Sequence, residues 1–153
     1  MRNLSRKQAD PEALLKRMAS LCAKSEQCSF DISTKLYKAG LPRDKREEIM
    51  EYLTANRFLD DARFARSFAN YKVRFSSWGK RKIRMALAAK RIPSSLIIPA
   101  LDSIADEDYE AAIRKALEAA KRSLKSDEKS PRTAIFKKLL VRGFESDVIS
   151  RVL

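Results

Sequence analysis

The sequence predicts an all-α protein made of three tandem three-helix repeats. Only 3 of its 153 residues are glycine and 5 are proline, so turn signals are sparse, while 44% of the residues are hydrophobic. Apolar residues recur at the i, i+3, i+4 and i+7 spacing of amphipathic helices. Corresponding apolar positions return after about fifty residues. We therefore expect an elongated, curved, solenoid-like array in which each repeat packs mainly on its neighbours.

The repeat is visible in three matching turns, at Leu41, Ile92 and Phe144, each of which follows a predicted helix. The residues five positions earlier are Leu36, Leu87 and Leu139, and those nine positions earlier are Ile32, Ile83 and Ile135. Any helical protein supplies some matches of this kind. Three unrelated helix pairs that happen to align therefore stay open as an alternative.

The predicted organisation is a basic N-terminal arm (1–9) followed by repeats at 10–59, 60–106 and 107–153. In the first repeat, Asp10 is a favourable N-cap and Pro11 suits the first helical position, so a helix is predicted to begin there. Gly40 is expected to end the second helix, because glycine readily adopts the left-handed conformation at a helix C-terminus. Pro42 opens the third helix.

The second repeat begins at two acids, Asp60 and Asp61, which are predicted to cap a helix. That helix carries an aromatic stripe expected to be buried, formed by Phe64, Phe68, Tyr71 and Phe75. A second helix with an apolar face at Ile83, Ala86 and Leu87 follows a short break at 76–79.

The later boundaries are marked by proline and by acids. Pro99 lies within the apolar segment LIIPAL at residues 96–101, so the helix predicted there is expected to begin late or to kink. Acidic residues crowd 102–110, where they favour the N-terminus of the next helix. Residues 123–131 are expected to form a polar loop.

The charge of the chain is strongly positive, with 33 Lys and Arg against 20 Asp and Glu and a net charge of +13. From Ala62 to Leu101 there is no acid, but there are ten cations: Arg63, Arg66, Lys72, Arg74, Lys80, Arg81, Lys82, Arg84, Lys90 and Arg91. A charged helical face is often only solvated. Forty residues without an acid instead favour a surface for phosphates or for an acidic protein. Trp78 and Tyr71 are candidates for stacking on bases, although we expect both to pack between helices.

Most enzyme chemistry is disfavoured by the composition. The chain has no histidine, and its two cysteines are too few to complete a tetrahedral metal site. The three glycines are isolated, so no phosphate-cradling loop is formed. We expect neither a cofactor nor a metal, and a cytoplasmic protein, because no apolar run is long enough for a membrane span or a signal peptide.

The segment FLDDARFARSF at residues 58–68, followed by Gly79, Ile83 and Leu87 at fixed spacing, resembles the RecX family of bacterial recombination regulators. The triplicated three-helix plan resembles that family too. The resemblance implies a regulator that binds the RecA filament, inhibits its ATP hydrolysis and strand exchange, and also binds DNA. We expect the protein to be a monomer. Arg57 and Arg91 stand where the family often has glycine, which puts a left-handed helix cap at Arg91 in doubt.

The ten cations are then predicted to form the RecA- and DNA-binding surface. One rival hypothesis is a sequence-nonspecific DNA-binding module that acts through phosphate contacts and is indifferent to RecA. Another is a divalent-metal nuclease that uses Asp60 and Asp61 as ligands.

Overall fold

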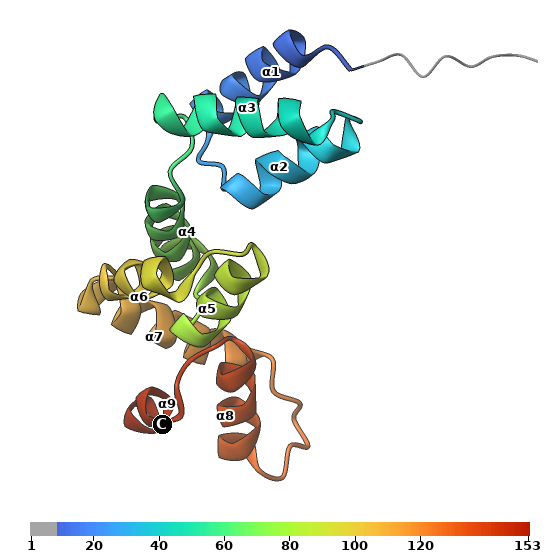
Figure 1. Ribbon diagram of the computed structural model, residues 1–153. Helices are drawn as coiled ribbons and strands as arrows, with labels where there is room; N and C mark the ends of the chain where they lie inside the picture. Colours follow the sequence, from blue (N-terminus) through green and yellow to red (C-terminus); the bar gives the residue numbers. More distant parts are fainter. Residues whose placement is uncertain (1–8) are drawn as a thin grey trace, which may run out of the picture. The chain divides into compact units, whose positions relative to one another are not determined.

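The computed structural model describes residues 9–153, and all regular secondary structure in that part of the chain is α-helical (Figure 1). The helices are α1 (Pro11–Lys24), α2 (Ser29–Lys38), α3 (Arg43–Ala55), α4 (Asp61–Ser76), α5 (Lys80–Ala89), α6 (Ser94–Asp102), α7 (Asp106–Arg122), α8 (Pro131–Val141) and α9 (Ser146–Val152). The predicted all-α class is confirmed. The basic arm predicted for residues 1–9 lies, except for its last residue, outside the described residues.

The chain divides into two compact units, residues 1–64 and residues 65–153. We call them unit 1 and unit 2. None of the helices in residues 9–153 has both the length and the apolar character that crossing a bilayer requires.

Unit 1 is built around α3, on which α1 and α2 pack (Figure 1). Asp10 caps α1 by accepting a hydrogen bond from the Glu12 N–H at 3.1 Å, and Pro11 is the first helical residue, as predicted. The core of the unit consists of buried aliphatic side chains from all three helices and the turns beside them: Met18, Ile32, Leu36, Leu41, Ile49, Leu53 and Leu59.

The three turns matched in the sequence have the same backbone hydrogen bond. The N–H of the turn residue donates to the carbonyl five positions earlier, from Leu41 to Leu36 at 3.3 Å, from Ile92 to Leu87 at 3.1 Å and from Phe144 to Leu139 at 3.2 Å. This is the Schellman ending of a helix, and it needs a left-handed residue before the turn residue. That residue is Gly40, Arg91 or Gly143, with φ of 83°, 59° and 99°. The doubt about Arg91 is thus resolved, because arginine adopts the left-handed conformation there.

The prediction for the buried face of α4 is wrong for Tyr71 and Phe75 and right for Phe64. Phe64 is buried, but Tyr71 is 57% exposed and Phe75 is 69% exposed. The face that packs inward is instead formed by Ala65, Ala69 and Val73, which are at most 1% exposed. Small side chains let the helix backbone approach its neighbours closely, so the larger aromatic side chains are left at the edge of the packed face.

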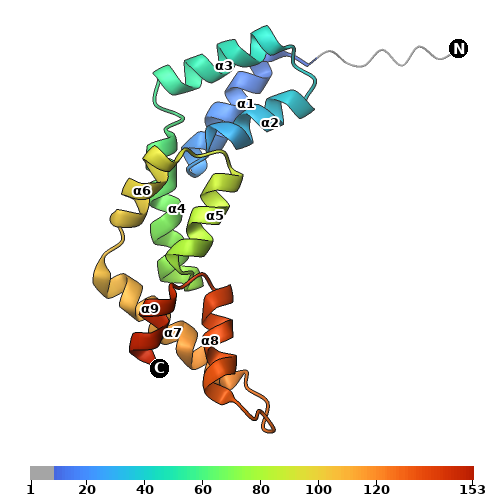
Figure 2. The same cartoon turned by 60° about the horizontal axis from the view of Figure 1, so that its bottom comes forward.

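In unit 2 the start of α5 meets the turn between α8 and α9 (Figure 2). The Gly79 N–H donates to the Arg142 carbonyl at 2.9 Å, and the Arg81 N–H donates to the Gly143 carbonyl at 3.0 Å. Ile83 and Leu87 are fully buried, as predicted. Of the two alternatives expected for α6, the late start is wrong, because the helix begins at Ser94 and continues past Pro99.

Candidate functional site

The positive charge of the protein is concentrated in unit 2. Residues 65–153 contain 20 Lys and Arg against 10 Asp and Glu, whereas residues 1–64 contain 13 Lys and Arg against 10 Asp and Glu. A partner with negative charge is therefore attracted to unit 2, and the attraction weakens as salt is added.

One of the ten predicted cations lies outside that unit. Arg63 belongs to unit 1, where its side chain forms an ion pair with Glu26 at 2.5 Å. It also donates to the backbone carbonyl of Arg57 at 3.1 Å. The hydrogen bond to Glu26 raises the pKa of Arg63. These contacts join the start of α4 to the loop after α1, so Arg63 has a structural role in unit 1.

The other nine cations lie in unit 2 and differ in how far they are already engaged. Arg66, Arg81 and Arg84 are exposed, and none of them has an ion pair within residues 9–153. Arg74 pairs with Asp108 at 3.0 Å. The set also contains four half-buried lysines, Lys72, Lys80, Lys82 and Lys90. Its last member, Arg91, is exposed. The three exposed arginines outside ion pairs are therefore the strongest candidates for phosphate contacts.

Trp78 is covered by lysines. The Nζ of Lys72 lies 4.4 Å from the centroid of its ring and the Nζ of Lys82 lies 4.5 Å from it. Phe68 packs edge-on against the same ring, with centroids 6.3 Å apart. A base can stack on Trp78 only if these lysines move.

Tyr71 and Phe75 are the exposed aromatic pair of α4. Their ring centroids are 4.9 Å apart, and more than half of each side chain is exposed. The expectation that Tyr71 packs between helices is wrong. An exposed ring beside cations is the arrangement that proteins use to stack on the bases of single strands.

The start of α5 is unusual because three cations, Lys80, Arg81 and Lys82, stand at the positive end of the helix dipole, and no acid lies in that turn. This placement disfavours the helix by itself. The first N–H groups are already used: the Lys80 N–H donates to the hydroxyl of Tyr109 at 3.0 Å, and those of Gly79 and Arg81 donate to carbonyls of the α8–α9 turn. An anion at this end of α5 would therefore be held mainly by side chains, because the N–H groups of Gly79, Lys80 and Arg81 already have acceptors.

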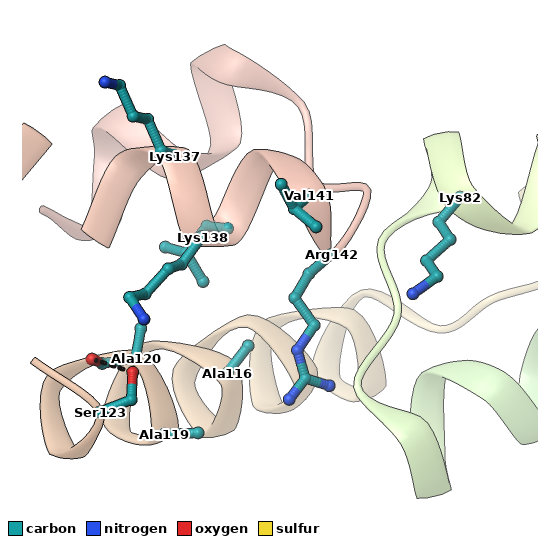
Figure 3. Close-up of a pocket in the computed structure, with 10 residues that line it drawn as sticks. Lys82, Ala116, Ala119, Ala120, Ser123, Lys137, Lys138, Val141 and Arg142 are labelled. Carbon is teal, nitrogen blue, oxygen red and sulfur yellow. Dashed lines mark hydrogen bonds between the residues drawn. The ribbon is translucent and has the colours of Figure 1, made fainter. Parts of the chain in front are cut away.

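A second set of cations, on α8 and at its C-terminal end, could not be placed from the sequence. Lys137, Lys138 and Arg142 line a hollow of about 470 Å³ together with Lys82 of α5 and small residues of α7 (Figure 3). The signal was present in the sequence, because residues 129–144 also contain no acid. The candidate surface of unit 2 therefore includes α8 as well as α4 and α5.

The two acids of the FLDD segment both cap helices, but not the same helix. Asp60 accepts a hydrogen bond from the Arg63 N–H at 3.0 Å and so caps α4. Asp61 accepts one from the Ser29 N–H at 2.8 Å and so caps α2, whose N-cap residue Cys28 makes no side-chain capping bond. Both carboxylates are thus engaged by helix termini. Within residues 9–153 no group of three or more acidic or cysteine side chains is placed to hold a metal ion.

Comparisons with known proteins agree with this architecture. The family model described as RecX, second three-helix domain, matches residues 60–101. Curated proteins named regulatory protein RecX match most of the chain. The one from Prosthecochloris aestuarii is 29% identical over 147 residues, covering 95% of this chain and 94% of its own length. The one from Chlorobium limicola is 29% identical over 126 residues, covering 81% and 77%.

A longer relative, regulatory protein RecX of Bacillus licheniformis, is 32% identical over 124 residues, and the match covers 80% of this chain but 47% of that protein. Two crystal structures share the fold. One, of a regulatory protein RecX, aligns with a TM-score of 0.80 at 23% identity and covers 92% of this chain and 70% of the other. RecX from Lactobacillus salivarius aligns with a TM-score of 0.79 at 19% identity and covers 93% of both chains. The matched domain, the relatives that match most of the chain and the shared fold all indicate the same family. The chain belongs to the RecX family.

Proposed function

We propose that this protein regulates RecA by binding the RecA nucleoprotein filament and lowering its ATP hydrolysis and strand exchange. The proposal follows from the family to which the chain belongs. The observation that carries it is the concentration of positive charge in unit 2, above all on Arg66, Arg81 and Arg84, which are exposed and outside ion pairs. A filament of protein and DNA presents both carboxylates and phosphates, and such cations interact favourably with either.

The protein is proposed to act as a binding regulator and not as an enzyme. The acids that a nuclease hypothesis would use, Asp60 and Asp61, are engaged in capping α4 and α2. The three-helix repeats at 10–59, 60–106 and 107–153 remain our interpretation of the domain organisation. The second of them supplies most of the proposed surface.

The test is the ATPase rate of RecA on single-stranded DNA while the protein is titrated in below one molecule per RecA. We expect inhibition that excess DNA does not relieve. The triple variant Arg66→Glu, Arg81→Glu and Arg84→Glu should weaken inhibition about tenfold or more, because each reversal replaces an attraction by a repulsion. No effect of the wild-type protein on RecA would contradict the proposal.

A matched control reverses three exposed cations of unit 1, Lys16→Glu, Arg17→Glu and Lys35→Glu, and so changes the net charge of the protein by the same amount. This control should inhibit nearly as well as the wild type. Equal losses in both triple variants would mean that net charge, and not the surface of unit 2, determines binding.

A second candidate function is sequence-nonspecific binding of DNA. The exposed Tyr71 and Phe75 beside the cations of α4 favour it, because rings and cations together bind single strands. It predicts an affinity that falls steeply with salt and inhibition of RecA that excess DNA abolishes. The same titration therefore separates the two functions.

A further inference from the structure

The hollow beside α8 has an apolar floor and a cationic rim. The floor is formed by Ala116, Ala119 and Ala120 of α7 with Leu139 of α8, and the rim carries the four cations named above. Figure 3 shows Lys138 of α8 and Arg142, the residue after α8, reaching toward α7, and Lys82 extending toward them from α5.

A second hollow, of about 420 Å³, adjoins the first. Lys82 and Val141 line both, and the second is also lined by Met85, Trp78 and Leu140. Met85 is 73% exposed and Val141 is 77% exposed, so two apolar side chains that line these hollows stand in solvent. We call the two hollows together the α5–α8 groove.

Two cations of this groove are available to a partner. Lys137 and Lys138 are exposed, and neither has an ion pair within residues 9–153. Arg142 donates to the Ser76 carbonyl at 2.7 Å, which fixes the position of its guanidinium. Among residues 9–153, none of those that line the two hollows is acidic. The electrostatic attraction of the groove is therefore wholly for negative charge.

We propose that the α5–α8 groove binds an acidic, amphipathic segment of a protein partner. Leucine-like side chains of the segment would cover the alanine floor together with Met85 and Val141, and its carboxylates would face Lys137 and Lys138. The combination of apolar and cationic groups selects a peptide over a nucleic acid backbone, because phosphates would satisfy the rim and leave the exposed apolar side chains in water. The inference rests on the proposed function for the existence of a protein partner, but its test does not use RecA.

The probe is a fluorescein-labelled helical peptide of about 15 residues with glutamates on one face and leucines at i, i+3 and i+7 on the other, titrated by fluorescence anisotropy. A second peptide has the same glutamates and serine in place of each leucine. We expect the amphipathic peptide to bind at least about tenfold more tightly than the polar one, since only the former covers the apolar floor. Equal binding of the two peptides, or binding of neither, would overturn the inference.

Two double variants locate the binding. Met85→Ser with Val141→Ser leaves the charge unchanged and alters only exposed side chains, so the fold should survive. This variant should lower the affinity for the amphipathic peptide about tenfold and leave the affinity for single-stranded DNA unchanged. Lys137→Glu with Lys138→Glu should weaken the peptide at least as much, whereas Lys16→Glu with Arg17→Glu in unit 1 should change it little. An unchanged peptide affinity in the serine variant would also overturn the inference.

The result of the peptide titration does not depend on whether the protein inhibits RecA. If the peptide does not bind but the wild-type protein inhibits RecA, the groove is wrongly assigned and the proposed function stands. If the peptide binds as expected and RecA is unaffected, the groove stands and the proposed function fails.

Discussion

Gly79 and Gly143 meet backbone to backbone at the start of α5. A Cβ on Gly79 would overlap the carbonyl group of Gly143 and the nitrogen of Phe144, and a Cβ on Gly143 would overlap the backbone nitrogen and the Cβ of Lys82. These contacts would be shorter than the 3.0 Å below which real Cβ atoms are essentially never found. The atoms in the way are mostly backbone atoms, which cannot turn aside as a flexible side chain does. The two glycines therefore permit the close contact between α5 and the α8–α9 turn.

The first prediction concerns this contact. Gly79→Ala should lower the free energy of unfolding by about 3 kcal/mol, because the added methyl group forces the two backbones apart. Gly79 has a φ of −80°, which alanine adopts freely, so the whole effect is steric. Urea unfolding followed by circular dichroism measures it.

Gly40→Ala is the matched control for Gly79→Ala. Gly40 has a φ of 83°, and nothing lies within 4 Å of an added Cβ. Its substitution should cost only about 1 kcal/mol, the conformational penalty of a left-handed residue with a Cβ. A loss at Gly40 as large as that at Gly79 would show that close packing is not the cause.

The second prediction concerns the arginine after α3. Arg57 has a φ of 60°, and its neighbour Phe58 donates to the Leu53 carbonyl at 2.8 Å in a Schellman ending. Arg57→Gly should raise the free energy of unfolding by about 1 kcal/mol, because glycine adopts this conformation without a steric penalty. Arg57→Ala removes the same long side chain but keeps the Cβ, so it should give no such gain. A thermal unfolding curve for each variant measures the difference, and equal stabilities would refute the explanation.

The sequence correctly predicted the features that depend on the spacing of residues along one helix. The buried face at Ile83 and Leu87 and the matching turns at Leu41, Ile92 and Phe144 follow from the spacing of apolar residues, and each was found. The left-handed conformation of Arg91 was doubted from the sequence, because arginine carries a Cβ. On α4 two candidate faces lie side by side, one aromatic and one at Ala65, Ala69 and Val73. Hydrophobicity favours the aromatic face, whereas close helix packing selects the small side chains, and the sequence does not say which other helices will pack there.

The candidate site was predictable only as a stretch of charge. The absence of acids between residues 62 and 101 marked the cations of α4 and α5, and the same signal at residues 129–144 would have added α8. That Arg63 pairs with Glu26, 37 residues away, could not be predicted, because such a contact depends on how the helices pack. The use of Asp61 to cap α2 is nonlocal in the same way.

The third prediction tests that nonlocal cap. Asp61→Ala should lower the free energy of unfolding by about 1 kcal/mol and speed hydrogen exchange at the Ser29 amide, which loses its acceptor. Asp60→Ala should cost about the same but speed exchange at the Arg63 amide. Amide exchange followed by NMR distinguishes the two variants. If Asp61→Ala left Ser29 protected, the assignment of this carboxylate to α2 would be wrong.

The fourth prediction concerns Tyr109, whose hydroxyl joins two parts of unit 2. It accepts from the Lys80 N–H at 3.0 Å and donates to Glu145 at 2.7 Å. Burial raises the pKa of this hydroxyl above its ordinary value of 10.0; the Lys80 N–H opposes the rise and the bond to Glu145 adds to it. The folded protein therefore keeps a proton that the unfolded chain releases, so the stabilisation is complete below pH 10.0 and is lost as the pH rises above it.

Tyr109→Phe removes both hydrogen bonds and the ionisable group. At about pH 8 it should lower the free energy of unfolding by roughly 1–3 kcal/mol, because the Lys80 N–H and the Glu145 carboxylate lose a partner. Between about pH 9 and pH 11 its stability should fall less than that of the wild type, since the phenyl ring has no proton to release. Urea unfolding of both proteins across this range measures the two slopes. Parallel slopes would mean that Tyr109 is not the group responsible. A smaller slope in the variant would show that ionisation of the Tyr109 hydroxyl weakens the contact between α5 and the α8–α9 turn at high pH.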